Sequence, residues 1–214
     1  MYKFVIFDLD GTLLNTLSDL AEAGNHTLRK MGFPTHETDK YRYFVGNGIP
    51  KLIERMLPLN SSDETKKEAL KIFREYYNVH KEDFTKPYDG IIEMLEKIKE
   101  KGIKTAVVTN KAHEFADKMI KKYFGNLIDF VYGNVDGVPQ KPDPYWVLKA
   151  IKNCNVEKED VLYVGDSGVD METAINAGVN SCGVLWGFRD YEELKNKGAK
   201  LICSDCDELV KLIL

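Results

Sequence analysis

Three short apolar segments rich in β-branched residues constrain the fold of this chain more than any other feature. Each is followed directly by polar or glycine residues that favour a turn. Helical patterns separate the segments, so they predict buried strands of one parallel sheet. The expected strands are Lys3–Leu9, Ile103–Val108 and Asp160–Val164. The predicted fold class is therefore α/β, a Rossmann-like parallel sheet with helices on both faces.

The remaining alternation supports the same fold class. Helical periodicity that ends at glycine or begins after a turn marks the segments between strands. Three further strands are expected at Phe130–Tyr132, Ser181–Leu185 and Leu201–Cys203. The expected helices are Ile91–Lys101, Lys111–Phe124, Pro142–Asn153, Asp170–Ala177 and a terminal one from about Asp205.

One stretch breaks the alternation, because residues 15–85 are helical in pattern throughout. Its clearest periodic segments are Leu17–Met31, Ile49–Met56 and Thr65–Tyr77, with Gly, Pro and Asn between them. We interpret this stretch as a helical cap inserted after the first strand. The catalytic core would then consist of residues 1–14 and 86–214.

Composition excludes several classes of protein. The formal charge of -4 argues against a nucleic-acid partner, which would require clustered Lys and Arg facing phosphates. No apolar stretch reaches the length of about 18 residues that a bilayer span needs, and no secretory signal is evident. The 4 cysteines are too few for a disulfide scaffold. We therefore expect a cytoplasmic protein with no membrane partner.

Polar side chains gather at one edge of the predicted sheet. In open α/β sheets the carboxyl ends of the strands meet at one edge, where ligands bind. Crowded carboxylates repel one another unless a cation balances them, and oxygen ligands select Mg²⁺. The residues expected there are Asp8, Asp10, Thr109, Asn110, Lys141, Asp166 and Asp170. The pattern predicts a magnesium site.

The same residues carry a resemblance to a known family. Phe7–Leu13, Val107–Asn110, Lys141-Pro142 and Gly165–Ser167 with Asp170 resemble, in order, the four motifs of the haloacid dehalogenase-like hydrolase superfamily. The likeness covers the whole chain, and the inserted stretch resembles that family's helical cap of the first type. It implies an enzyme, a Mg²⁺-dependent phosphatase that acts on a small phosphorylated metabolite.

The resemblance also implies a role for each motif residue. Asp8 is the nucleophile that forms an aspartyl phosphate, and Asp10 is the general acid and base. Thr109, Asn110 and Lys141 hold the phosphoryl group. The metal ligands implied are Asp8, Asp10 through its backbone carbonyl, and Asp166. Asp170 is expected to orient the groups around the metal, and direct binding of the metal by Asp170 is the alternative.

A loop in the cap suggests the substrate. Residues 45–49, with Leu52–Arg55 after them, resemble phosphoglycolate phosphatases. Gly46 and Gly48 permit close backbone approach, and the following helix N-terminus offers N–H groups to a carboxylate. Gly46, Asn47 and Gly48 are therefore the predicted substrate residues, and a plain turn between helices is the alternative. Asn15 departs from the Asp common in such relatives, which leaves the substrate less defined.

Other functions stay open at this point. A pyrophosphatase or nucleotidase would share the same core, and so would a β-phosphoglucomutase-like enzyme, although that commonly has Val at Thr12. A phosphonatase would need a cap lysine, for which Lys51 and Lys66 are available. A dehalogenase would lack the second acid, Asp10. From another class, a non-catalytic binding module on the same fold would not hydrolyse an aryl phosphate.

Overall fold

The computed structural model describes residues 1–214, which form two compact units. The core unit comprises Met1–Leu14 and Pro87–Leu214, and the cap unit comprises Asn15–Lys86. The chain passes between them through β2 (Leu14–Asn15) and β3 (Lys86–Pro87), which pair as a two-stranded sheet. The boundaries of these units lie within one residue of those expected from the sequence.

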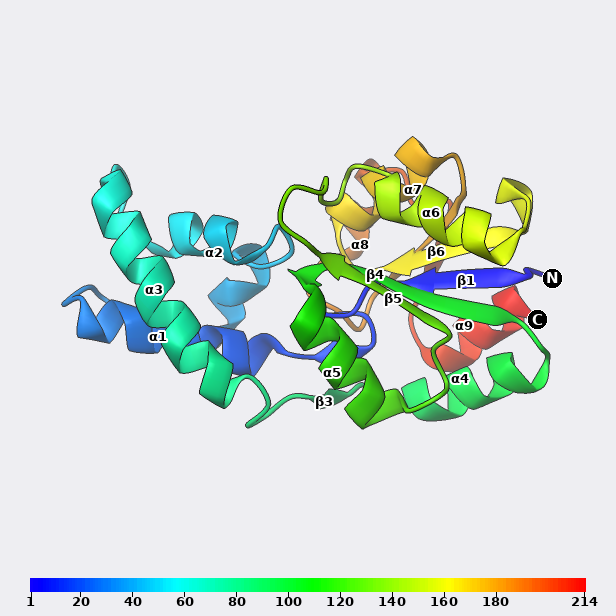
Figure 1. Cartoon of the computed structure of the whole chain (residues 1–214), viewed down its shortest axis with the longest axis horizontal. Helices are drawn as coiled ribbons and strands as arrows, with labels where there is room; N and C mark the ends of the chain where they lie inside the picture. The colour runs from blue at the N-terminus through cyan, green and yellow to red at the C-terminus, as the bar shows by residue number, and fades with distance from the viewer. The chain divides into compact units, whose positions relative to one another are not determined.

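The core unit is built on a six-stranded sheet, and every neighbouring pair of its strands is parallel (Figure 1). The strand order is β5-β4-β1-β6-β7-β8, so β1 lies inside the sheet between β4 and β6. The strands are β1 (Phe4–Phe7), β4 (Lys104–Ala112), β5 (Phe130–Asn134), β6 (Val161–Gly165), β7 (Asn180–Val184) and β8 (Leu201–Cys203). This arrangement confirms the predicted α/β class.

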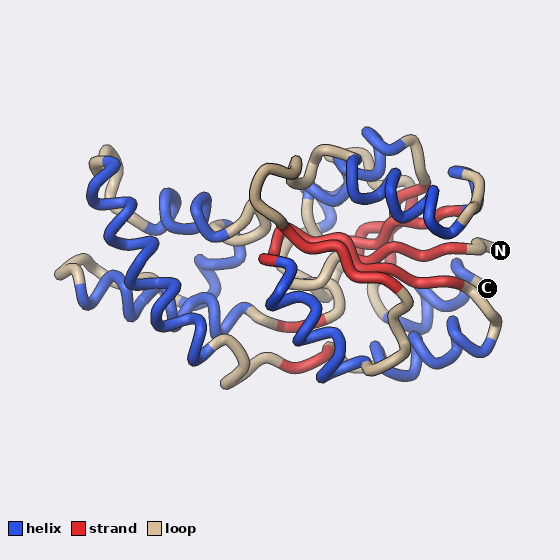
Figure 2. The backbone as a smooth tube through the Cα atoms, viewed as in Figure 1, coloured by secondary structure: helices blue, strands red, loops and turns tan.

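Helices cover both faces of the sheet (Figure 2). Val5 and Phe7 of β1 pack on one face and Phe4 and Ile6 on the other, because successive side chains of a strand point to opposite sides. On the first face lie α4 (Ile91–Glu100), α5 (His113–Phe124) and α9 (Cys206–Ile213). On the second lie α6 (Tyr145–Cys154) and α7 (Gly168–Ala177).

Some element boundaries differ from those expected. The strand β4 continues to Ala112, so Lys111 belongs to the strand and not to the helix predicted from it. The helix α6 begins at Tyr145 and not at Pro142, because Pro144 disfavours helical backbone at the residue before it. The short elements α8 (Tyr191–Asn196) and η2 (Lys158–Asp160) were not predicted, since neither is long enough to show a periodic pattern.

The cap unit consists of α1 (Leu17–Lys30), η1 (Thr38–Tyr43), α2 (Ile49–Met56) and α3 (Asp63–His80). The buried carboxylate of Asp19 fixes the start of α1 to the segment that follows α3. It accepts hydrogen bonds from the backbone N–H of Phe84 (3.0 Å) and from both the N–H (2.8 Å) and the hydroxyl (2.6 Å) of Thr85. The two ends of the cap are therefore held together within the cap itself.

None of the helices has both the length and the apolar composition that crossing a bilayer requires.

Candidate active site

Three buried carboxylates meet at the carboxyl edge of the sheet. Asp8 follows β1, Asp166 follows β6, and Asp170 lies in the first turn of α7. One oxygen from each lies within 4.8 Å of the others. The sheet order explains the meeting, because β1 and β6 are neighbours and their ends share one edge.

Lys141 joins two of these acids. Its Nζ lies 2.7 Å from Oδ1 of Asp8 and 2.7 Å from Oδ1 of Asp170, and its side chain is 3% exposed. Burial alone would lower the pKa of Lys141, but the two carboxylates outweigh it and raise the pKa well above its usual value. Lys141 is therefore a fixed positive charge between the two acids.

Asp166 is held by groups from two other loops. Its Oδ1 accepts a hydrogen bond from the Thr12 hydroxyl (2.9 Å), and its Oδ2 accepts one from the backbone N–H of Phe188 (2.8 Å). The two loops can lie this close to Asp166 only because each has a glycine there. An added Cβ on Gly11 would lie 2.3 Å from Oδ2 of Asp166, and one on Gly187 would lie 2.2 Å from the Cβ of Asp166. The turn at Gly11 is thus set by the neighbouring acid as well as by its φ of +92°.

The segment around Gly187 was not predicted as part of the site. Trp186 donates its indole N–H to the carbonyl of Thr12 (2.9 Å), which ties this segment to the loop after β1. In the sequence, Trp186 and Phe188 resemble ordinary packing residues, and nothing in their spacing indicates these backbone contacts.

Both carboxylate oxygens of Asp170 accept hydrogen bonds from other groups of the protein. Oδ2 accepts hydrogen bonds from the backbone N–H (3.0 Å) and hydroxyl (2.6 Å) of Ser167, which caps α7. Oδ1 accepts from Lys141 (2.7 Å) and from the Tyr163 hydroxyl (3.3 Å). The carboxylate is completely buried, so these contacts fix its orientation.

Asp10 pairs with a lysine that sequence reasoning missed. Nζ of Lys111 lies 3.0 Å from Oδ1 and 3.2 Å from Oδ2 of Asp10, and the Lys111 side chain is only 5% exposed. The signal was present, because Lys111 directly follows Asn110. Its assignment to the next helix concealed that it ends beside the first motif.

Thr109 and Asn110 lie at the end of β4, and both are buried. Asn110 holds the loop that carries Lys141: its Oδ1 accepts from the backbone N–H of Lys141 (2.9 Å), and its Nδ2 donates to the carbonyl of Lys141 (3.3 Å). The Thr109 hydroxyl accepts from the backbone N–H of Lys111 (3.3 Å). The predicted residues of the second and third motifs are thus in direct contact.

The charges of this cluster fit a divalent cation. Burial, followed by the neighbouring carboxylate of Asp170, raises the pKa of Asp8 to about 7, although Lys141 opposes the shift, and raises that of Asp166 to about 8. Oδ1 of Asp8 is buried, and the Lys141 ammonium lies 2.7 Å from it. Acids outnumber ammonium groups by two, and a hard cation bound by oxygens would balance them. We call the following residues the core site: Asp8, Asp10, Lys111, Lys141, Asp166 and Asp170.

The predicted cap residues lie in a loop between η1 and α2, which we call the cap loop (residues 44–48). Gly46 and Gly48 have φ of 107° and 78°, values that disfavour any side chain. Arg55 organises the loop by donating hydrogen bonds to the carbonyls of Tyr43 (3.3 Å), Phe44 (3.0 Å) and Val45 (3.5 Å), and to Oδ1 of Asn47 (2.9 Å). The amide oxygen of Asn47 therefore serves the loop itself.

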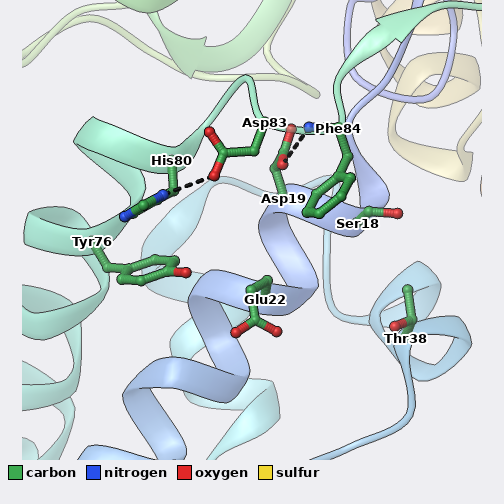
Figure 3. A pocket seen from close by; sticks show the side chains of 8 residues that line it. All are labelled: Ser18, Asp19, Glu22, Thr38, Tyr76, His80, Asp83 and Phe84. Atoms are coloured by element: carbon green, nitrogen blue, oxygen red, sulfur yellow. Dashed lines mark hydrogen bonds and ion pairs between the residues drawn. The ribbon is translucent and has the colours of Figure 1, made fainter.

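A pocket of about 520 Å³ lies within the cap unit (Figure 3). Its acidic side chains have partners in the cap: Asp19 binds the Phe84 N–H, Asp83 lies 2.7 Å from Nδ1 of His80, and Glu22 pairs with Arg29. The lining residues are Ser18, Asp19, Glu22, Thr38, Tyr76, His80, Asp83 and Phe84. These contacts explain the acidic residues of the pocket as part of the cap's own structure.

Comparison with known proteins places the chain among hydrolases. The family model for haloacid dehalogenase-like hydrolase matches residues 5–184. A phosphoglycolate phosphatase from Aquifex aeolicus is 33% identical over 212 residues, which cover 99% of this chain and 96% of that protein. A proposed pyrophosphatase from Caldanaerobacter subterraneus is 34% identical, covering 98% of this chain and 93% of the relative.

The fold has solved counterparts. The crystal structure of a proposed phosphoglycolate phosphatase from Lactobacillus delbrueckii superimposes with a TM-score of 0.95. It is 29% identical, and the match covers 100% of this chain and 98% of that one.

Proposed function

The chain belongs to the haloacid dehalogenase-like hydrolases, and we propose that it is a Mg²⁺-dependent phosphatase whose preferred substrate is phosphoglycolate. The observation that carries the proposal is the core site, in which the buried carboxylate of Asp8 lies beside two further buried carboxylates and 2.7 Å from the ammonium of a buried lysine. Nucleophile, charge balance and metal ligands are thus available at one place.

In this proposal Asp8 attacks the phosphorus of the ester, and the bond to the leaving oxygen breaks as the aspartyl phosphate forms. Asp10 donates its proton to the leaving alkoxide. It then accepts a proton from the water that attacks the aspartyl phosphate, and this releases inorganic phosphate and restores Asp8. One residue serves both steps, because each leaves Asp10 in the state that the other requires.

The groups around Asp8 stabilise charge on the phosphoryl oxygens. Lys141 lies 2.7 Å from Asp8 and brings a fixed positive charge, and Thr109 with the backbone N–H of Asn110 adds donors. Asp8, the backbone carbonyl of Asp10 and Asp166 would hold Mg²⁺. When bound, the ion offsets the negative charge of the nucleophile and of the phosphoryl group.

Asp170 acts in this proposal as a positioning residue. Ser167, Tyr163 and Lys141 engage both of its oxygens, so it has less to offer a metal than Asp8 or Asp166. Its contribution is to hold Lys141 toward Asp8.

Names of relatives support a small anionic substrate without choosing one. Relatives of similar identity are named phosphoglycolate phosphatase and proposed pyrophosphatase. Gly46 and Gly48, both at positive φ, permit close backbone approach, and the N-terminus of α2 that follows offers N–H groups; this suits a carboxylate better than a nucleobase, which needs a stacking surface. This favours phosphoglycolate, and pyrophosphate is the second candidate.

The test is kcat/KM with Mg²⁺ across phosphoglycolate, pyrophosphate, nucleoside monophosphates and hexose phosphates. The proposal expects phosphoglycolate to give the highest value. A value for any other ester about tenfold above that for phosphoglycolate would refute the substrate and leave the aspartyl-phosphate chemistry standing. No hydrolysis of any ester, including an aryl phosphate, would refute the enzyme itself.

A further inference from the structure

The core site contains two buried lysines, and only one of them has a role in the chemistry described so far. Lys141 lies between Asp8 and Asp170, on the side of the nucleophile. Lys111 lies against Asp10, the group that serves the leaving oxygen. We propose that Lys111 recognises a negative charge on the leaving group, the carboxylate of phosphoglycolate, and so determines specificity. This rests on the function proposed above.

Bond lengths bring the two charges together. Asp10 must contact the ester oxygen to protonate it. In phosphoglycolate a single methylene separates this oxygen from the carboxyl carbon, so a carboxylate oxygen lies roughly 3 Å from the ester oxygen by ordinary bond lengths. Nζ of Lys111 is 3.0 Å from Oδ1 of Asp10. A carboxylate on a substrate in contact with Asp10 therefore falls within reach of Lys111.

A lysine can serve two acids at once. An ammonium has three rotatable donors, and Lys141 demonstrates the arrangement by contacting Asp8 and Asp170 at 2.7 Å each. Because the Lys111 side chain is already 5% exposed in the folded protein, little further water is lost when a second anion binds. In such surroundings an ion pair is stronger than on the open surface.

The same property would suit other anionic leaving groups. In pyrophosphate the bridging oxygen is bonded directly to a second charged phosphoryl group, which a cation beside Asp10 would also attract. A neutral alcohol offers nothing to Lys111. The inference therefore concerns a class of substrate, esters with charge on the leaving side, and it accommodates relatives named for either phosphoglycolate or pyrophosphate.

The experiment compares two esters that differ in one charge. We would measure kcat and KM for phosphoglycolate and for ethyl phosphate with wild type, Lys111→Met and Lys111→Arg. The value of kcat/KM should fall for both substrates in Lys111→Met, because Asp10 loses its ion-pair partner. The phosphoglycolate value of kcat/KM should fall at least about tenfold further, mainly through KM, as expected for a lost charge-assisted hydrogen bond. Lys111→Arg should recover much of the difference.

The matched control is Lys104→Met, at the start of the same strand. Lys104 also pairs with an aspartate, Asp129 at 2.9 Å, but its side chain is 58% exposed. It should leave the ratio between the two esters unchanged. If thermal unfolding shows no cooperative transition for Lys111→Met, this variant is not folded, and Lys111→Gln replaces it, since Gln retains a donor without the charge.

An equal fall for both esters in Lys111→Met would overturn the inference and leave Lys111 acting through Asp10 alone. The failure of the proposed function would look different. If wild type preferred pyrophosphate to phosphoglycolate, phosphoglycolate would not be the substrate, yet the ratio of phosphoglycolate to ethyl phosphate would still report whether Lys111 selects charge.

Discussion

The core site and the cap loop differ in which part of the residue defines them, the side chain or the backbone. The core site is defined by its side chains, which are buried acids and lysines in ion pairs, such as Lys141 between Asp8 and Asp170. In the cap loop the backbone has the defining shape, with Gly46 at positive φ and Arg55 bound to three successive carbonyls. The comparison indicates that the core site depends on the charge of its side chains, whereas the cap loop depends on the conformation of its backbone.

The largest effect should come from Asp8→Asn. An amide cannot form the phosphoenzyme, so kcat should fall below about 1% of wild type for every ester, whether charged or neutral. Loss of a buried charge leaves the packing intact, so the thermal midpoint should not decrease. Asp39→Asn, on the exposed surface of the cap, is the control and should retain full activity. Turnover above that level, without deamidation, would contradict the role of Asp8.

Removal of the metal should also abolish activity on all esters alike. Excess chelator should stop hydrolysis and Mg²⁺ should restore it, because the acids of the core site outnumber its ammonium groups. Asp166→Ala should raise the Mg²⁺ concentration needed for half-maximal activity by at least about tenfold. Full activity in excess chelator would show that hydrolysis does not require a metal ion.

A smaller and selective effect is expected from the cap loop. Gly48→Val places a β-branched side chain at a φ of 78°, which distorts the loop. The KM for phosphoglycolate should rise by about tenfold, and more than the KM for an aryl phosphate. Gly32→Val is the matched control, since Gly32 also lies in the cap with a similar φ of 74° but outside the cap loop. If both variants behave alike, the loop does not select the substrate.

The smallest effect concerns pH and stability. Without metal, burial raises the pKa of Asp8 to about 7 and of Asp166 to about 8, against about 3.9 for an unfolded Asp. The folded state then binds more protons than the unfolded state between these values, so stability should fall as pH rises through this window. The thermal midpoint should drop by a few degrees from about pH 5.5 to about pH 8.5, and less with saturating Mg²⁺. An equal drop in the thermal midpoint with and without Mg²⁺ would contradict the binding of Mg²⁺ by these two acids.

The sequence predicted the core in detail because its signals are local. Each apolar run with a polar end produced a strand, and the strand order brought Asp8 and Asp166 together as the topology required. Asp170 was predicted in the first turn of a helix, and its capping contact with Ser167 has the spacing of a capping box. Such features can be read because they depend on residues a few positions apart.

The parts that were missed depend on contacts between distant segments. Lys111 was assigned to a helix, since nothing near it in sequence shows that β4 continues to Ala112. The contact of Trp186 with Thr12 joins residues 174 positions apart. Arg55 was noted only as part of a resemblance, and most of its hydrogen bonds to the cap loop are to backbone carbonyls, which leave no pattern in the sequence.

The most direct test of the central claim is to trap the phosphoenzyme on Asp8. In Asp10→Asn, an aryl phosphate with a good leaving group still phosphorylates Asp8, whereas hydrolysis of the aspartyl phosphate lacks its base. Mixing should release one equivalent of the aryl alcohol in a burst, and acid-quenched protein should gain the mass of one phosphoryl group, about 80 Da, on the peptide that contains Asp8. A burst with the phosphoryl group on another residue, or turnover with no label in this variant, would contradict the mechanism.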